Sequence, residues 1–288
     1  MSRMSIALLT TALAAVAAIA GFIWWGRQPV TAPPPMSPPA VEAPVAIAPP
    51  PEVPAIQYPI PDSTEPEPLP SLDKSDRQIT SALSALLGQK SVLTFIQPDG
   101  FIRRVVATVD NLPRTHAAPR LWPVNPTGGR FAPVGPEGSK TIGTDNSLRY
   151  APLLVMLESV NARHATAVYV RFYPLFQKAY EELGYPGKYF NDRLVAVIDH
   201  LLSTPEPSGP IAVRLVEVKG PQKQIQPWVH YEYADPALEQ LSSGQKVLVR
   251  MGLVNERRAK VKLRELRAAV TNAAQDIKAN AATASAPR

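Results

Sequence analysis

The sequence of 288 residues contains no cysteine. This absence excludes a disulfide framework, a thiolate zinc site, an iron–sulfur cluster, a catalytic cysteine and a lipid-modified cysteine anchor. The four histidines have no zinc-ligand spacing, and the glycine-containing motifs of nucleotide-binding loops and of the serine-hydrolase elbow are also missing. We therefore expect neither a metal nor a cofactor in this protein.

Charged residues are missing from residues 5–25, an apolar run whose length matches the roughly 30 Å hydrocarbon core of a bilayer. The run ends on Trp24 and Trp25, and indole rings favour the headgroup boundary. A signal peptide cleaved after residue 20 is the alternative, but the apolar run continues past that position. The sequence predicts an uncleaved single-pass anchor in a bacterial inner membrane, with residues 1–4 cytoplasmic and the C-terminal domain periplasmic.

Basic residues are missing from residues 28–70, which hold 16 of the 33 prolines and carry only acidic charges. Proline fixes φ and removes amide donors, so neither a helix nor a sheet can propagate there. The composition predicts an extended, acidic, Pro-rich linker over residues 26–72 that serves as a spacer. A docking track for a proline-binding module is the alternative, although such a track usually places a basic residue beside its prolines.

Residues 71–288 carry the opposite charge, with 28 Lys and Arg against 19 Asp and Glu. Their apolar spacing predicts one globular domain over residues 73–271, mainly α with a small β-hairpin element (α+β). The Ala-rich residues 272–288 are expected to form a disordered tail.

Helices are indicated by apolar residues at intervals of three and four. The first is capped by Asp76 and stops at Gly88. Further helices are expected over residues 102–109, 147–158, 162–183, 189–202, from 236, over 243–252 and from Asn255 to 270. Pro174 is expected to kink or split the helix that contains it.

Strands are indicated where the apolar period changes to two. Residues 211–215 and 228–233 alternate and predict a β-hairpin. The loop over residues 112–143 is rich in proline and glycine but also holds several large apolar side chains. We expect it to be ordered and packed on the helices, with residues 131–134 and 140–142 paired as a second small hairpin.

Three sequence segments are characteristic of the domain: RYAPLL (149–154), VRFYPLFQKAYEELGYP (170–186) and FNDRLVAVIDHLL (190–202). Together with the anchor and linker, they resemble a bacterial envelope family known only as domain of unknown function 3014. The resemblance covers roughly residues 75–270. It implies the same architecture, and it supplies no activity, cofactor or catalytic residue.

The aromatic candidates for binding lie in two places. Tyrosines between residues 169 and 189 have basic neighbours and could stack on sugars or grip an extended peptide, although tyrosines near an apolar stripe more often belong to the core. From these and the Pro/Gly-rich loop, the predicted binding residues are Arg120, Trp122, Arg171, Tyr173 and Tyr180.

Charged residues provide candidates for a catalytic site and for a basic binding surface. Asp192 and Asp199, with nearby Glu182, could supply acid–base chemistry on a glycan, although a solvated helix face is the commoner explanation. In the last helix, the predicted basic surface consists of Lys260, Arg264 and Arg267, which could meet anionic lipid or an acidic wall polymer.

These observations favour a membrane-tethered, non-enzymatic envelope protein that binds or assembles with another envelope protein or a cell-wall polymer. No nucleic-acid partner is expected, because an exported domain rarely meets one. The alternatives are an envelope hydrolase that uses the acidic residues, and an assembly scaffold recognised through its linker.

Overall fold

The computed structural model describes residues 55–60, 68–216 and 227–284, with side chains as far as residue 273. The predicted anchor over residues 5–25 and most of the predicted linker lie outside these ranges. Within the described part of the chain, no helix is both long enough and apolar enough to cross a membrane.

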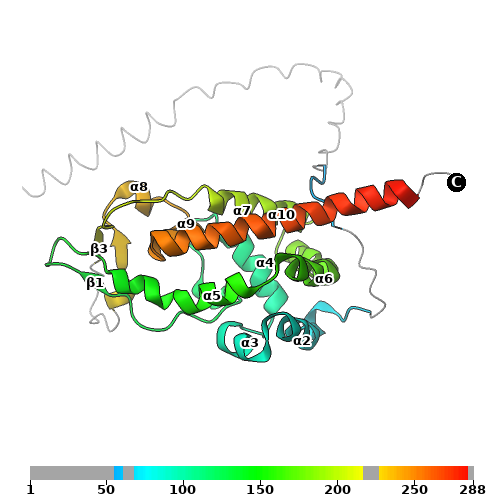
Figure 1. The fold of residues 1–288 in the computed structure, drawn as a ribbon, viewed down its shortest axis with the longest axis horizontal. Helices are drawn as coiled ribbons and strands as arrows, with labels where there is room; N and C mark the ends of the chain where they lie inside the picture. Colours follow the sequence, from blue (N-terminus) through cyan, green and yellow to red (C-terminus); the bar gives the residue numbers. More distant parts are fainter. Residues whose placement is uncertain (1–54, 61–67, 217–226, 285–288) are drawn as a thin grey trace, which may run out of the picture. The chain divides into compact units, whose positions relative to one another are not determined.

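The described chain is mainly helical with two small antiparallel sheets, as the sequence predicted (Figure 1). The helices are α2 (Asp76–Leu87), α3 (Gln89–Phe95), α4 (Phe101–Asn111), α5 (Ala151–Ser159), α6 (Ala162–Glu182), α7 (Phe190–Leu202), α8 (Pro236–Glu239), α9 (Ser243–Arg250) and α10 (Leu253–Ala284). The strands are β1 (Pro133–Val134), β2 (Thr141–Ile142), β3 (Val213–Leu215) and β4 (Tyr231–Tyr233).

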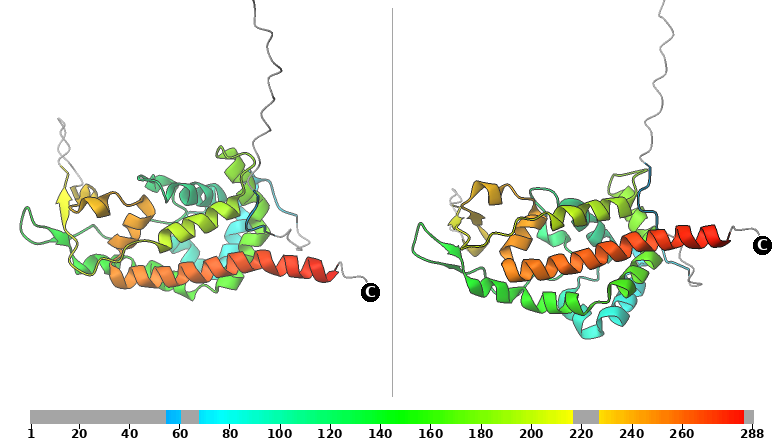
Figure 2. Two further views of the ribbon diagram at one scale, coloured as in Figure 1. Left: turned by 90° about the horizontal axis from the view of Figure 1, so that it is seen from above. Right: turned by 45° about the horizontal axis from the view of Figure 1, so that its top comes forward.

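The long helix α10 organises the domain. It packs against α5, α6, α7 and α9, and it runs along one side of the bundle, as the left view of Figure 2 shows. The predicted apolar stripe of α10 explains this position, since Ala259 and Val270 are buried and Leu263 packs on the core. The main core lies where α2, α4, α6 and α7 meet, around the fully buried Phe172 and Phe190.

Local signals in the sequence account for several helix ends. Gly88 ends α2 with a φ of 83°, a conformation that glycine adopts without strain. The Asn161 side chain caps α6 by accepting hydrogen bonds from two backbone amides, and Ser242 forms a reciprocal capping box with Gln245 at the start of α9. Asp235 caps α8, which has proline in its first turn.

Both predicted hairpins are present, and they are joined. β3 pairs with β4 in the register Val213 with Tyr233, and β1 pairs with β2. Lys140 and Ile211 link the two sheets, because the Lys140 carbonyl accepts from the Val213 amide (2.8 Å) and the Ile211 carbonyl accepts from the Ile142 amide (2.9 Å). The Pro/Gly-rich loop is therefore ordered, and its second half forms part of a β layer at one end of α10 (Figure 1).

Several details differ from the prediction. α6 continues through Pro174 as one helix, and α3 was not predicted. α10 begins at Leu253, because the Asn255 side chain donates to the carbonyls of Ser147 and Met251 instead of capping the helix. Residues 272–284 are helical, where the sequence predicted a disordered tail.

The end of the predicted linker is packed on the domain. Leu72 is buried, and Leu69 and Ile60 contact the main core. The folded part of the chain therefore includes segments from before residue 73. Residues 55–60, which we call the strap, are blue in Figure 1 and lie beside α10.

Candidate peptide-binding site

The domain holds the backbone of the strap through side chains at the start of α7. The Asp192 carboxylate accepts from the amides of Gln57 (3.0 Å) and Tyr58 (2.8 Å). The Asn191 side-chain amide donates to the Tyr58 carbonyl (2.8 Å). The Tyr189 hydroxyl accepts from the Ile60 amide (2.6 Å). The strap bends at Gln57 and Tyr58, so that two successive amides face the same carboxylate. Four of its backbone groups are thus bound by Tyr189, Asn191 and Asp192.

Asn191 is fixed in the orientation that this contact requires. Its side chain is fully buried, and its Oδ1 accepts from the Tyr169 hydroxyl (3.1 Å), which leaves the amide nitrogen directed at the strap. The backbone amide of Asn191 donates to the Tyr173 hydroxyl (3.4 Å). Burial raises the pKa of Tyr169 and of Tyr173 well above the ordinary value, so both phenols keep their protons. Such preorganised donors lose little entropy when they bind a ligand.

Two side chains of the strap also contact the domain. The Tyr58 hydroxyl interacts with Arg267 of α10, whose guanidinium also binds Asp199 through two bonds of 2.5 and 2.9 Å. The pKa of Arg267 is raised, first by its hydrogen bond to Asp199 and less by Tyr58. Ile60 packs against the main core. We call Tyr189, Asn191, Asp192 and Arg267 together the strap site.

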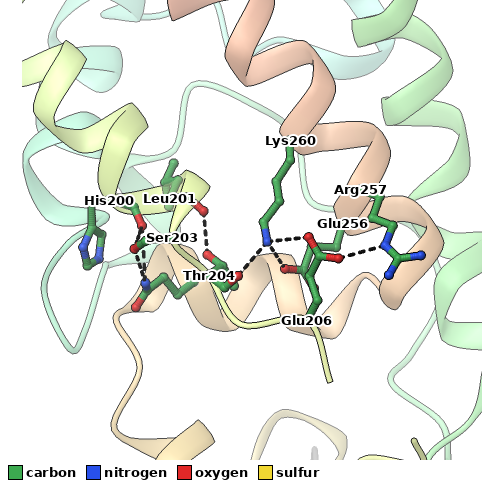
Figure 3. A network of polar contacts seen from close by, with 9 residues as sticks. His200, Leu201, Ser203, Thr204, Glu206, Glu256, Arg257 and Lys260 are labelled. Carbon is green, nitrogen blue, oxygen red and sulfur yellow. Dashed lines mark hydrogen bonds and ion pairs between the residues drawn. The ribbon is translucent and has the colours of Figure 1, made fainter. Parts of the chain in front are cut away.

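A second polar cluster joins α10 to the chain that follows α7 (Figure 3). The Lys260 ammonium group lies 2.6 Å from the Thr204 carbonyl and 2.9 Å from one carboxylate oxygen each of Glu206 and Glu256. Lys260 and Glu256 are buried. Burial raises the pKa of Glu256, and hydrogen bonds from Arg257 and then Lys260 lower the pKa of Glu206 to about 2. The cluster is an internal ionic clamp.

This clamp corrects part of the predicted basic surface. Lys260 is 3% exposed and points into the protein, so it cannot meet an anionic partner. Arg267 is held by Asp199 and contributes to the strap site. Arg264 is exposed, as predicted. The helical spacing alone could not reveal this, because the connection that covers Lys260 comes from a distant part of the sequence.

Each of the three carboxylates considered for catalysis is engaged. Asp192 binds strap amides and Asp199 binds Arg267. Glu182 forms an ion pair of 2.9 Å with Arg103. The three carboxylates therefore have three different partners, from the strap, from α10 and from α4.

The predicted aromatic residues are also placed differently. Tyr173 and Tyr180 are buried in the core, so their rings cannot form an exposed aromatic surface. Of the tyrosines between residues 169 and 189, Tyr189 bonds the strap through its hydroxyl, whereas the hydroxyls of Tyr169 and Tyr173 bond Asn191. Arg171 is half-buried, with its guanidinium 5.4 Å from the Phe172 ring.

The loop candidates pack on α4. The Arg120 side chain is exposed, while its carbonyl accepts from Arg104 (2.5 Å) and the neighbouring Leu121 carbonyl accepts from Thr108 (3.1 Å). Trp122 is half-buried, and its indole nitrogen is enclosed without a hydrogen-bond partner among the described residues. Neither residue lies in the strap site. Over the described ranges, no three His, Asp or Glu residues are grouped so that they could hold a metal ion.

Comparison with known proteins gives one result. A family model described as "Protein of unknown function (DUF3014)" matches residues 101–267, more than half of the chain. No curated protein and no solved structure matches it. The four residues of the strap site lie inside the matched range, and the strap lies before it.

Proposed function

Since the chain belongs to the DUF3014 family, whose description assigns no activity, we propose its function from its own geometry: it is a membrane-tethered module of the bacterial envelope that binds a short peptide segment of another envelope protein. The observation that carries this proposal is the recognition of four backbone groups of the strap by Tyr189, Asn191 and Asp192. In peptide recognition, main-chain hydrogen bonds commonly supply affinity and side-chain contacts supply specificity.

The location in the envelope rests on the sequence. The apolar run over residues 5–25 supplies the anchor, and the proline-rich segment after it supplies the spacer. Protease treatment of intact spheroplasts tests the orientation: the domain is expected to be digested, and a protected domain would place it in the cytoplasm.

Photocrosslinking in the native host tests the binding function. A photoreactive residue replaces the exposed Lys188, one position before Tyr189, in the full chain. We expect an adduct with a second polypeptide that is lost when Asp192→Ala is added. The control places the same photoreactive residue at the exposed Arg77 of α2, where an Asp192-dependent adduct is not expected. An adduct that is unaffected by Asp192→Ala, or no adduct even after residues 55–60 are deleted, would refute the proposed function.

A further inference from the structure

The strap shows which peptide chemistry its site accepts. We infer that the strap site binds, from another envelope protein, a short segment of the form Tyr-Pro-aliphatic, and that the strap, through Gln57-Tyr58-Pro59-Ile60, is a resident copy of this ligand that competes with it. This inference rests on the proposed function and names its ligand class.

The pattern of backbone contacts explains the proline. The site binds the amides of residues 57, 58 and 60 and does not use the amide of residue 59. Position 59 is occupied by proline, the one residue type that has no amide hydrogen. Proline therefore costs the ligand no hydrogen bond here, and its fixed φ reduces the entropy that the ligand loses on binding.

The side-chain contacts explain the residues on either side. The tyrosine before the proline places its hydroxyl at Arg267, which Asp199 holds in position. The aliphatic residue after the proline packs on the core and must keep its amide for the Tyr189 hydroxyl. A second proline at that position would remove this donor, so the site distinguishes Tyr-Pro-aliphatic from an ordinary polyproline segment.

The degree of burial makes the strap exchangeable. None of its six residues is buried, and Ile56 is 52% exposed. Segments with little buried surface detach at a lower free energy than the core. Because the strap is joined to the domain by a short connection, its effective concentration at the site is on the order of millimolar. For a strap that itself binds the site with a micromolar intrinsic dissociation constant, the apparent dissociation constant of an external copy rises about 1,000-fold.

Fluorescence anisotropy with a labelled peptide of sequence AIQYPIP, a copy of residues 55–61, tests this inference. The full chain is compared in detergent micelles with a released variant that lacks residues 55–60 and therefore lacks the four backbone groups that occupy the site; its fold is checked by circular dichroism. We expect the released variant to bind the peptide with a dissociation constant at least about 100-fold lower than that of the unmodified chain. Equal affinity, or no binding to the folded released variant, would overturn the inference.

Three further measurements test the chemistry of the site. In the released variant, Asp192→Ala is expected to weaken binding about 10- to 100-fold, because two bonds to a carboxylate are lost. Arg267→Ala should weaken the Tyr peptide more than a Phe peptide, whereas the matched control Arg264→Ala on the same helix should change neither. A peptide N-methylated at isoleucine should bind at least about 5-fold more weakly, since its amide can no longer donate. Insensitivity to all three changes would overturn the assigned site.

Two other results are informative. If the full chain forms an oligomer that Tyr58→Ala dissociates, the strap binds a second copy and the inference of a foreign ligand is overturned. If the peptide fails to bind while the Asp192-dependent crosslink in cells persists, the ligand class is wrong but the proposed binding function stands.

Discussion

The ionic clamp between α10 and the chain after α7 gives the sharpest stability prediction. Replacing Lys260 by methionine removes the ammonium group that lies 2.9 Å from Glu256, whose side chain is 1% exposed. The carboxylate is then buried without its cation, and the Thr204 carbonyl loses its donor. Breaking a buried ion pair in this way costs about 3–5 kcal/mol, a large part of the roughly 5–15 kcal/mol by which a domain is stable.

Urea unfolding of the full chain, followed by circular dichroism, measures this loss. The control is Arg264→Met, which changes an exposed position of the same helix and should alter the free energy of unfolding by no more than about 0.5 kcal/mol. Replacing both partners, as Lys260→Met/Glu256→Met, should recover most of the lost free energy of unfolding, since an apolar pair of similar volume often replaces a buried ion pair without loss of stability.

The pH dependence provides an internal check. Burial already raises the pKa of Glu256, and loss of Lys260 raises it further. A carboxyl group with a raised pKa in the folded state is favoured when protonated, so the cost of Lys260→Met should be smaller at pH 4.5 than at pH 8. A loss below about 1 kcal/mol at pH 8, or a double variant no more stable than Lys260→Met, would refute the clamp.

Three further changes are predicted to act on stability, each measured by urea unfolding. Glu206→Gln should reduce the fall in the free energy of unfolding at acidic pH. The pKa of Glu206 is lowered from 4.5 to about 2, first by Arg257, so its contribution to stability is present above pH 4.5 and is lost as the pH falls towards 2. An unchanged fall in stability at acidic pH would contradict this. Asn161→Ala should cost about 0.5–2 kcal/mol because the α6 cap is lost, whereas Asn161→Asp should retain most of the stability. Gly244→Ala should cost about 1–3 kcal/mol through overpacking, since its Cβ would lie 2.6 Å from Leu201 Cδ2 and 3.1 Å from the Leu112 carbonyl oxygen; a gain in stability would show that these neighbours move aside.

The sequence predicted those parts of the fold that depend on near neighbours. The spacing of Phe190, Leu194, Val197 and Leu201 defined α7, because a 3.6-residue period is a local property. The alternation around Val213 likewise predicted β3. α3 was not predicted because it contains only seven residues. A periodic apolar pattern needs two full turns or more to be recognised.

The candidate site could not be predicted in the same way, because it joins distant residues. Each bond between the strap and the start of α7 spans 129 to 135 residues of sequence. In addition, the strap lies within a composition that indicates an extended linker. The bend at Gln57 and Tyr58 differs from the extended conformation that the composition predicts, and the composition gives no sign that a folded domain binds this segment.

Glu256 and Lys260 show the same limit within one helix. An acidic and a basic residue four positions apart usually stabilise a solvated face. Here the connection after α7 covers the pair, and Thr204 and Glu206 supply the remaining polar partners. The local pattern of a surface pair and that of a buried clamp are identical, so only the tertiary contact distinguishes them.

Asp192 and Asp199 show how tertiary contacts give two residues of one helix face different partners. Seven residues apart, they lie on one face of α7, separated by about 10.5 Å along the helix axis. Asp199 holds Arg267 of the neighbouring helix, and Asp192 holds the strap backbone. The shared face thus places a carboxylate and, through Asp199, a guanidinium group beside the same strap, an arrangement that fits the proposed binding of a peptide.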